Sequence, residues 1–210
     1  MNESTFAKEQ CLALLRDVHD ELPPGTTTRI QIGGGVAIMS IDPSRASSDI
    51  DLFMEEVPPA IERASAKVAE ARHLDEGWIN NIPAQLGLIP FDVEETPFFE
   101  GPRLIVEVID PISMLLLKLH AGRDKDTEDI VLLMKHTGIT SEEMLHSLID
   151  EYAAEYPDAG IDIFWMKQNA TEAAVAVREH FWGVGTPHGH DTAEPHGAAA
   201  DVPFDIDNGS

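Results

Sequence analysis

Two aspartates separated by one residue, Asp49 and Asp51, have the spacing best suited to chemistry in this 210-residue chain. On a β-strand, alternate positions share a face, so both carboxylates would point the same way while Ile50, Leu52 and Met54 face the core. Adjacent carboxylates repel each other, and a divalent cation removes that penalty. Mg²⁺ binds through one or two carboxylates together with substrate phosphates. The pair predicts a magnesium site, and its alternative is an exposed strand face of solvated acids.

Three consecutive glycines, Gly33, Gly34 and Gly35, lie between a strand pattern at 28–32 and an apolar helical pattern at 36–39. Glycine lets the backbone approach a ligand closely, and the free N–H groups at a helix start favour an anion. The run lacks the Lys-Ser/Thr ending of a P-loop and the spacing of a dinucleotide-binding fingerprint. Alone, such a run is more often only a turn.

A basic cluster follows an apolar helix in the second half of the chain. Three of the 14 basic residues lie within twelve positions: Lys118, Arg123 and Lys125. A lysine at the end of an apolar helix usually extends to water, but beside a carboxylate-bound metal Lys118 would reach a triphosphate. Asp126 and Asp129 share a face of the next helix. The alternative role of Asp126 is to cap that helix and offset its dipole.

The elements that must position these residues predict an α/β (α+β) protein. We expect strands at 28–32, 49–54 and 104–109, and a loop with one or two short strands at 77–101. We expect helices at 7–22, 58–72, 111–122, 126–136, 140–156 and 161–181, with Thr140 as the cap of the fifth. The expected organisation is an α/β core at 1–110, a helical part packed on it at 111–182, and a disordered acidic tail at 183–210.

The order of the three features resembles the nucleotidyltransferase superfamily, which has the DNA polymerase β-like fold. Its signature is a Gly-Gly or Gly-Ser pair, a spacer and an Asp-hydrophobic-Asp strand, which correspond here to Gly34-Gly35 and Asp49-Ile50-Asp51. The sheet would then be small and mixed, with flanking helices. The superfamily often has a small hydroxyl residue after the first glycine, where this chain has Gly35.

Further motifs are similar to the toxin-type nucleotidyltransferases of bacterial abortive-infection systems and to an uncharacterised relative family. The run from Arg45 through Ser47 to Leu52 resembles their Arg-x-Thr-x-Asp-hydrophobic-Asp motif. Residues 118–130 resemble their later lysine and Asp-x-x-Asp motifs, and Trp78-Ile79-Asn80 is similar to the relative family. The resemblance covers roughly residues 28–156.

This resemblance implies a Mg²⁺-dependent enzyme that moves a nucleoside monophosphate from an NTP to an acceptor hydroxyl. Asp49 and Asp51 would bind the metal. The nucleotide would be bound by Gly34, Gly35, Arg45, Ser47, Lys118, Asp126 and Asp129. Lys118 would also act in catalysis, and Glu107, in the strand at 104–109, is the candidate for a third carboxylate, in competition with Asp92 and Asp110. Glu107 or Asp129 would deprotonate the acceptor.

The sequence does not identify the acceptor of the nucleoside monophosphate. The resemblance allows RNA, a protein side chain or a small molecule, and the protein would be the toxin of a toxin–antitoxin pair with an antitoxin partner. Two other classes are a nucleotide-binding pseudoenzyme and a non-catalytic interaction protein of such a pair.

The amino-acid composition limits the classes of binding partner that we expect. The chain has 38 Asp and Glu against 14 Lys and Arg, a net charge of −24, so a broad surface for duplex nucleic acid or anionic lipid is not expected. Cys11 is the single cysteine, which excludes an intrachain disulfide. The amino terminus lacks the features of a secretory signal and no stretch is long enough to span a bilayer, so a cytoplasmic protein is expected.

Overall fold

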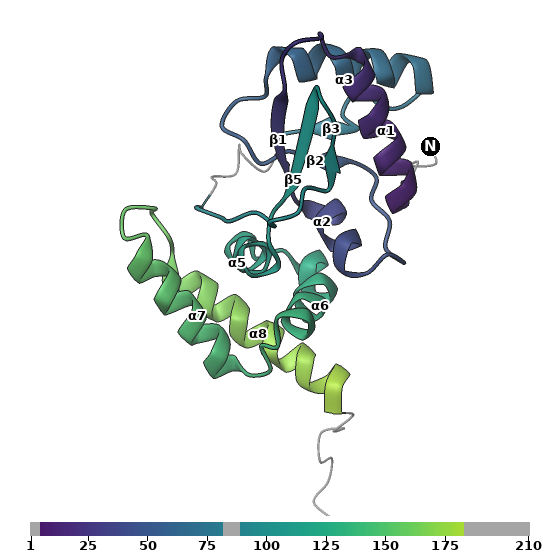
Figure 1. Cartoon of the computed structure of the whole chain (residues 1–210). Coiled ribbons are helices and arrows are strands. Elements are labelled where there is room, and N and C mark those ends of the chain that lie inside the picture. The colour runs from purple at the N-terminus through teal and green to yellow at the C-terminus, as the bar shows by residue number, and fades with distance from the viewer. Residues whose placement is uncertain (1–4, 82–88, 183–210) are drawn as a thin grey trace, which may run out of the picture.

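The computed structural model describes residues 5–81 and 89–182, which form an α+β fold (Figure 1). The predicted tail at 183–210 lies outside the described residues. The helices are α1 (Lys8–Glu21), α2 (Gly34–Ile41), α3 (Pro59–Arg72), α5 (Pro111–Ala121), α6 (Thr127–Thr137), α7 (Glu142–Glu155) and α8 (Ile163–Trp182), with a 3₁₀ turn η1 (Asp124–Asp126). The strands are β1 (Thr28–Ile32), β2 (Ile50–Asp51), β3 (Ile79–Asn80), β4 (Phe99–Glu100) and β5 (Leu104–Val108).

The strands form two small sheets that meet at one bridge. β1 lies parallel to β5, with Ile30 opposite Val106, and β4 is antiparallel to β5. β2 and β3 pair in parallel. An antiparallel bridge between Ile32 and Leu52 connects the two sheets, so the Asp-bearing segment lies beside the end of β1. The small mixed sheet that we expected is therefore present.

The strand predicted at 49–54 is much shorter than expected. Only Ile50 and Asp51 form β2, and Leu52 makes the bridge to β1. Ile50 and Leu52 are fully buried as predicted, while Met54 is half-buried. The backbone N–H of Phe53 then donates to the carbonyl of Gln31 on β1, so the segment ends against the neighbouring strand.

The predicted cap of α7 is wrong by one residue. Ser141, not Thr140, has the extended backbone of an N-cap, and its hydroxyl accepts a hydrogen bond from the Met144 N–H at 3.3 Å. Ser141 is as good a capping residue as threonine, so the residue types did not distinguish the two positions.

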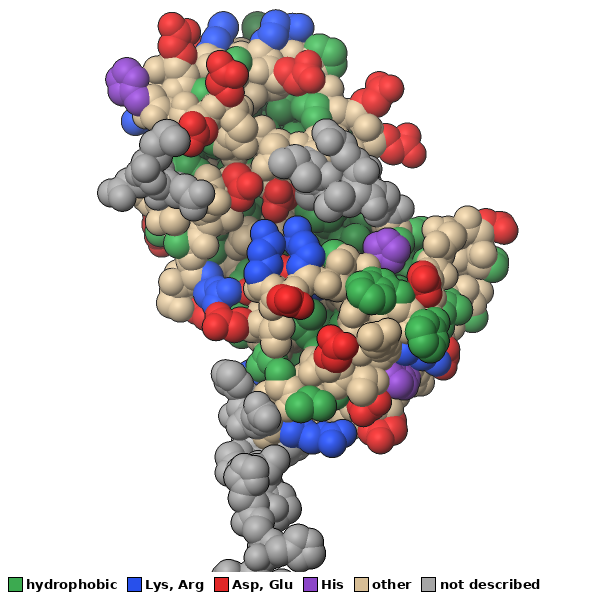
Figure 2. Space-filling view, turned by 180° about the vertical axis from the view of Figure 1, so that it is seen from behind, with side chains coloured by type: hydrophobic (Ala, Val, Ile, Leu, Met, Phe, Trp, Pro, Cys, Tyr) green, Lys and Arg blue, Asp and Glu red, His purple; other side chains and the backbone are tan. Residues whose placement is uncertain are grey.

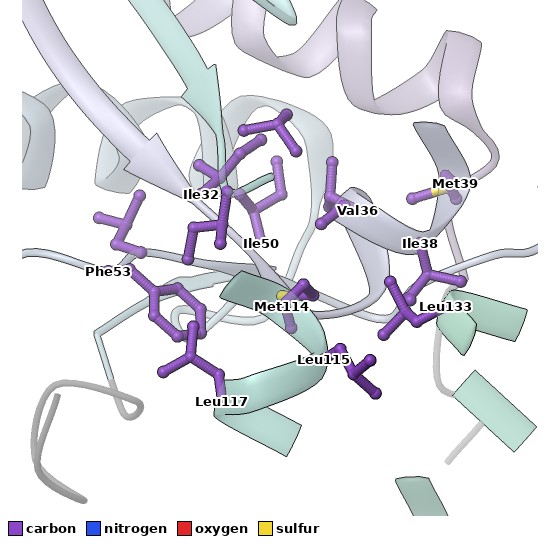
Figure 3. Packing of buried hydrophobic residues seen from close by; sticks show 14 of the residues in the cluster. Ile32, Val36, Ile38, Met39, Ile50, Phe53, Met114, Leu115, Leu117 and Leu133 are labelled. Carbon is purple, nitrogen blue, oxygen red and sulfur yellow. The ribbon is translucent and has the colours of Figure 1, made fainter. Parts of the chain in front are cut away.

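One buried hydrophobic cluster runs through both the α/β part and the helical part. Figure 3 shows Ile32 of β1, Val36 of α2 and Ile50 of β2 together with side chains of α5 and α6. α1 and α3 pack against each other on the sheet, whereas α7 and α8 pair at the opposite end of the molecule (Figure 1). α5 thus joins the two parts, and its last turn lies at their junction.

Within the described ranges, no helix combines the length and the apolar character needed to cross a membrane.

Candidate functional site

A cavity of about 740 Å³ lies between the two parts of the molecule. The start of α2 and the segment from Ala46 to Phe53 form one wall, while the last turns of α5, η1 and the first turn of α6 form the other. The cavity therefore brings together the three sequence features that we singled out for chemistry. Figure 2 shows a small group of Lys and Arg side chains midway down the back face of the molecule, with acidic side chains around them.

The Asp pair lies on one side of this cavity. Asp51 is on β2 opposite Asn80 of β3. The Asn80 amide donates to Oδ2 of Asp49 at 3.1 Å and also hydrogen-bonds to Asp51. The hydroxyls of Ser47 and Ser48 each lie 3.5 Å from Oδ1 of Asp49. Neutral groups therefore hold the two carboxylates in place, and both side chains line the cavity.

The electrostatics of Asp51 favour a bound cation. Burial raises the pKa of the Asp51 carboxyl, and the nearby Asp49 charge raises it further, against the hydrogen bond from Asn80 and the charges of Arg123 and Lys118. Two ionised carboxylates here carry a penalty that a divalent cation would remove. The described residues contain no cluster of three or more His, Cys, Asp or Glu side chains suited to a metal. A two-carboxylate site suits Mg²⁺, which takes its other ligands from water and phosphate.

Each of the three glycines makes room for a side chain of the segment that carries the Asp pair. A Cβ on Gly34 would collide with the Asp51 carboxylate, and one on Gly35 would collide with the Ser47 hydroxyl. A Cβ on Gly33 would collide with the Phe53 ring. Gly34 also has a positive φ of +57°. The glycine run therefore sets the amino end of α2 directly against the Asp pair, which a turn alone would not require.

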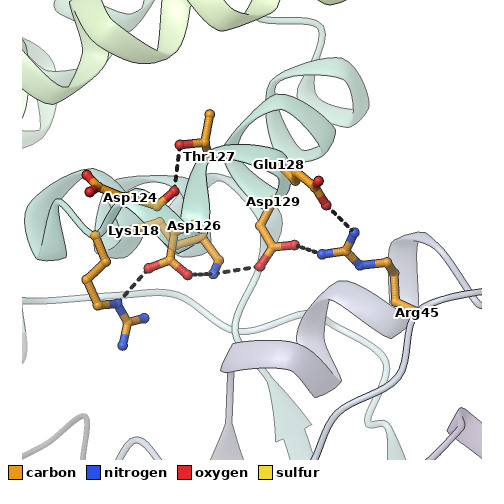
Figure 4. Close-up of polar contacts among 8 residues, drawn as sticks. Arg45, Lys118, Asp124, Asp126, Thr127, Glu128 and Asp129 are labelled. Atoms are coloured by element: carbon orange, nitrogen blue, oxygen red, sulfur yellow. Dashed lines mark hydrogen bonds and ion pairs between the residues drawn. The ribbon is translucent and has the colours of Figure 1, made fainter.

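Two members of the basic cluster, Lys118 and Arg123, belong to an ion-pair network on the opposite wall (Figure 4). The Lys118 ammonium lies 2.8 Å from Oδ1 of Asp126 and 2.9 Å from Oδ2 of Asp129, and its side chain is only 4% exposed. Arg123 Nε contacts the other Asp126 oxygen at 2.7 Å, and Arg45 Nη2 contacts Oδ1 of Asp129 at 2.5 Å. The network links α5, η1, α6 and the loop after α2.

The alternative interpretation of Lys118 is wrong, and that of Asp126 is right in position only, because Asp126 is the N-cap residue of α6. Lys118 does not extend to water, because its ammonium is enclosed by two carboxylates. Asp126 makes no side-chain cap on α6. Burial by itself would raise the pKa of the Asp126 carboxyl, but the hydrogen bonds and charges of Lys118 and Arg123 outweigh burial and hold the pKa below its usual value.

The last turn of α5, which carries Lys118, is held from behind by α8. The Asn169 amide donates to the Leu119 carbonyl at 2.7 Å, and the Trp165 indole donates to the His120 carbonyl at 3.1 Å. These contacts satisfy carbonyls that a helix end leaves without partners. The helical part thereby positions one wall of the cavity.

Most of the predicted site residues meet at this cavity. Those lining it are Gly34, Gly35, Ser47, Asp49, Asp51, Lys118, Asp126 and Asp129. Arg45 joins through its ion pairs with Asp129 and, at 3.2 Å, Glu128.

Glu107 is not brought to the Asp pair. It does not line the cavity, and its carboxylate is paired with Arg29 of β1. Of its competitors, Asp110 accepts hydrogen bonds from the backbone N–H groups of Ile112 and Ser113 and so caps α5, and neither Asp110 nor Asp92 is a lining residue. The additional carboxylates of the cavity are Asp126 and Asp129.

Several contributors to the site were not given a role from the sequence, although Lys125 was recognised as part of the basic cluster. Phe53, His120 and Lys125 line the cavity, and Asn80 bridges the two aspartates. Phe53 has the same strand parity as Asp49 and Asp51, a signal that could have found it. The other three depend on how distant segments pack.

Comparison with known proteins gave no match. No protein-family model matches the chain, and no curated protein or solved structure matches it significantly.

Proposed function

We propose that this protein is a Mg²⁺-dependent nucleotidyltransferase that moves a nucleoside monophosphate from an NTP to an acceptor hydroxyl. The observation that carries the proposal is the close fit of Gly34 against Asp51 at the start of α2, in a cavity that Asp49 also lines. This arrangement sets a phosphate-binding backbone beside two carboxylates suited to Mg²⁺. The order of motifs along the chain supports the same function.

Within this proposal, each group of cavity residues has a separate role. Asp49 and Asp51 would hold Mg²⁺, which would orient the α-phosphate and neutralise charge that develops during transfer. The backbone at Gly34 and Gly35 would contact the phosphates. Asp129 lines the cavity and Glu107 does not, so Asp129 is the better placed of the two to remove the acceptor proton, and it would have to do so while paired with Lys118 and Arg45.

The site has room for a nucleotide beside its polar groups. Phe53, Met114 and Leu117 give the cavity an apolar wall, which suits a nucleobase or an apolar part of the acceptor. A cytoplasmic toxin paired with an antitoxin, acting on RNA, protein or a small molecule, is part of the proposal. The net charge of −24 favours an acceptor held by local contacts over one bound along an extended nucleic-acid surface.

The direct test is transfer of label from each of the four NTPs, labelled at the α-phosphate, in the presence of Mg²⁺ and either total cell RNA or lysate. Incorporation identifies both donor and acceptor. Asp49→Asn and Asp51→Asn should each abolish transfer and leave a folded protein, because the metal loses half of its protein ligands. Full activity in both variants would contradict the proposal.

A nucleotide-binding pseudoenzyme is the second candidate, and the position of Glu107 favours it. The strand carboxylate expected to complete the catalytic set is paired with Arg29 outside the cavity. NTP binding that requires Mg²⁺ but yields no pyrophosphate with any acceptor would identify this function.

A further inference from the structure

Charge pairing in the cavity singles out Lys125, a residue that the proposed function does not use. The cavity is lined by four aspartates and by three basic side chains, Lys118, Arg123 and Lys125. Lys118 and Arg123 are held by Asp126, and Lys118 also by Asp129. Lys125 has no ion-paired or hydrogen-bonded partner among the residues that the structure describes.

The contrast between paired and unpaired basic side chains extends to the rest of the described structure. Counting only pairs between residues that the structure describes, at least nine of the 14 basic residues are in ion pairs with Asp or Glu. Within the parts of the chain that the structure describes, only Lys125 both lines the cavity and lacks an ion-pair partner. Lys125 is therefore the basic side chain of the cavity whose charge no described carboxylate offsets by an ion pair.

Lys118 cannot easily supply that charge to a ligand. Its ammonium is enclosed between Asp126 and Asp129. A phosphate that displaced one of these carboxylates would break a buried ion pair of Lys118, which is unfavourable. Lys125 lies on η1, is exposed and lines the cavity, so its ammonium is open to a ligand without any ion pair of the network being broken.

We infer that Lys125 binds the terminal phosphates of the nucleoside triphosphate. This inference rests on the proposed function. If the α-phosphate lies at the Asp pair on one wall, the β- and γ-phosphates extend across the cavity toward η1 on the other. An ammonium there offsets the negative charge of the pyrophosphate leaving group. Lys125 would thus favour triphosphates over monophosphates.

The test is calorimetric titration of the full chain with ATP, GTP, CTP and UTP in Mg²⁺, followed by the di- and monophosphate of the best-binding nucleoside. Lys125→Ala should weaken triphosphate binding about tenfold, the effect of one charge-assisted contact. Monophosphate binding should stay unchanged. Lys125→Arg should retain most of the triphosphate affinity, and Lys135→Ala on α6 should bind all the nucleotides like the wild type. Lys125 is exposed and its side chain has no partner in the described part of the chain, so the melting temperature of Lys125→Ala should match that of the wild type.

Two results separate the inference from the proposed function. If Lys125→Ala binds triphosphates like the wild type while Asp51→Asn does not bind them, or if it loses mono- and triphosphate affinity equally, the role of Lys125 is wrong and the proposed function stands. If the wild type binds no nucleotide in Mg²⁺, both are overturned.

Discussion

At the scale of single residues, the site depends on how closely Gly34 approaches Asp51. The backbone at Gly34 has a left-handed conformation and has no room for a Cβ against the Asp51 carboxylate. Gly138, at the end of α6, also has a positive φ of +73°, but open space surrounds its Cα. Both glycines therefore have a left-handed backbone that disfavours alanine, but only at Gly34 would the added Cβ collide with another side chain.

Gly34→Ala should consequently cost more stability than Gly138→Ala. Both changes force alanine into the left-handed region, at roughly 1–2 kcal/mol. Only Gly34→Ala must also displace the carboxylate, so it should lower the free energy of unfolding further and weaken Mg²⁺-dependent nucleotide binding. Urea unfolding of both variants checks the first effect and titration with the best-binding NTP the second. Equal losses of stability would show that the collision is relieved without cost.

Asp51 is predicted to destabilise the metal-free protein at neutral pH. Its pKa in the folded state is raised above the ordinary value of 3.8, first by burial and then by Asp49. As pH rises from 3.8 through the folded pKa, the folded state holds its proton more firmly than the unfolded state, so this group's contribution to stability falls. Above that range the full penalty is present.

Asp51→Asn should therefore raise the melting temperature at pH 7 in metal-free buffer. The difference from the wild type should shrink as the pH falls through the folded pKa of Asp51, because the wild-type carboxyl then takes up its proton and loses its charge. Mg²⁺ should raise the melting temperature of the wild type more than that of Asp51→Asn, because binding to the folded state stabilises it. Thermal melts across this pH range provide the measurement, and a difference that grows toward acid pH would contradict the prediction.

At the scale of elements, the Lys118 network joins segments that are distant in the sequence. Lys118 on α5 contacts Asp126 and Asp129 across the Gly122 turn, and Arg45 reaches Asp129 from the loop after α2. Such a network stabilises the fold only while each buried charge keeps its partners. It fixes α6 relative to the α/β part.

Lys118→Ala should destabilise the protein by about 2–3 kcal/mol, below the roughly 3–5 kcal/mol of a buried charge left with no partner, because Asp126 keeps Arg123 and Asp129 keeps Arg45. The double variant Lys118→Met/Asp126→Asn should recover part of this loss, because it removes one of the two buried carboxylates that have lost the ammonium. Lys135→Ala, an exposed change on α6, should stay within about 0.5 kcal/mol of the wild type. Chemical unfolding of the three variants checks the ranking. A loss for Lys118→Ala as small as that for Lys135→Ala would mean that water replaces the ammonium.

The sequence predicts the elements better than the contacts between them. Hydrophobic periodicity is local, so it located α1, α3, β1 and β5 closely. It overestimated β2, whose length depends on how much of β3 is available for pairing. Residue type also could not choose between Thr140 and Ser141 as a cap, because the choice depends on the backbone.

For the site, spacing along the chain identified both walls but not what each residue does there. The Asp pair and Lys118 do line one cavity. That Lys118 is enclosed by Asp126 and Asp129, and that Glu107 pairs with Arg29, follows from tertiary packing, which no local pattern encodes.

At the scale of the whole molecule, the excess of acidic charge dominates. Even if each of the 14 basic residues neutralised one acid, 24 acidic side chains would have no cationic partner. Several of the ion pairs lie at the surface, such as Lys67 with Glu21, both exposed, and the exposed Arg72 with the half-buried Asp17. Exposed pairs of this kind contribute little, so repulsion among the acids should outweigh them and oppose the compact state.

The melting temperature should therefore rise when NaCl is added from about 10 mM to about 200 mM. Over this range the Debye length falls to below about 10 Å, which screens repulsion between acids spread over the surface. The Lys118 network is buried and should be screened much less, so it should retain its contribution. The measurement is a series of thermal melts in NaCl and in KCl at matched ionic strength, with metal-free buffer so that cation binding at the Asp pair does not contribute. Both salts should give the same rise, because screening depends on ionic strength and not on the cation. A melting temperature that falls with salt would instead mean that the surface ion pairs stabilise the fold more than the excess negative charge destabilises it.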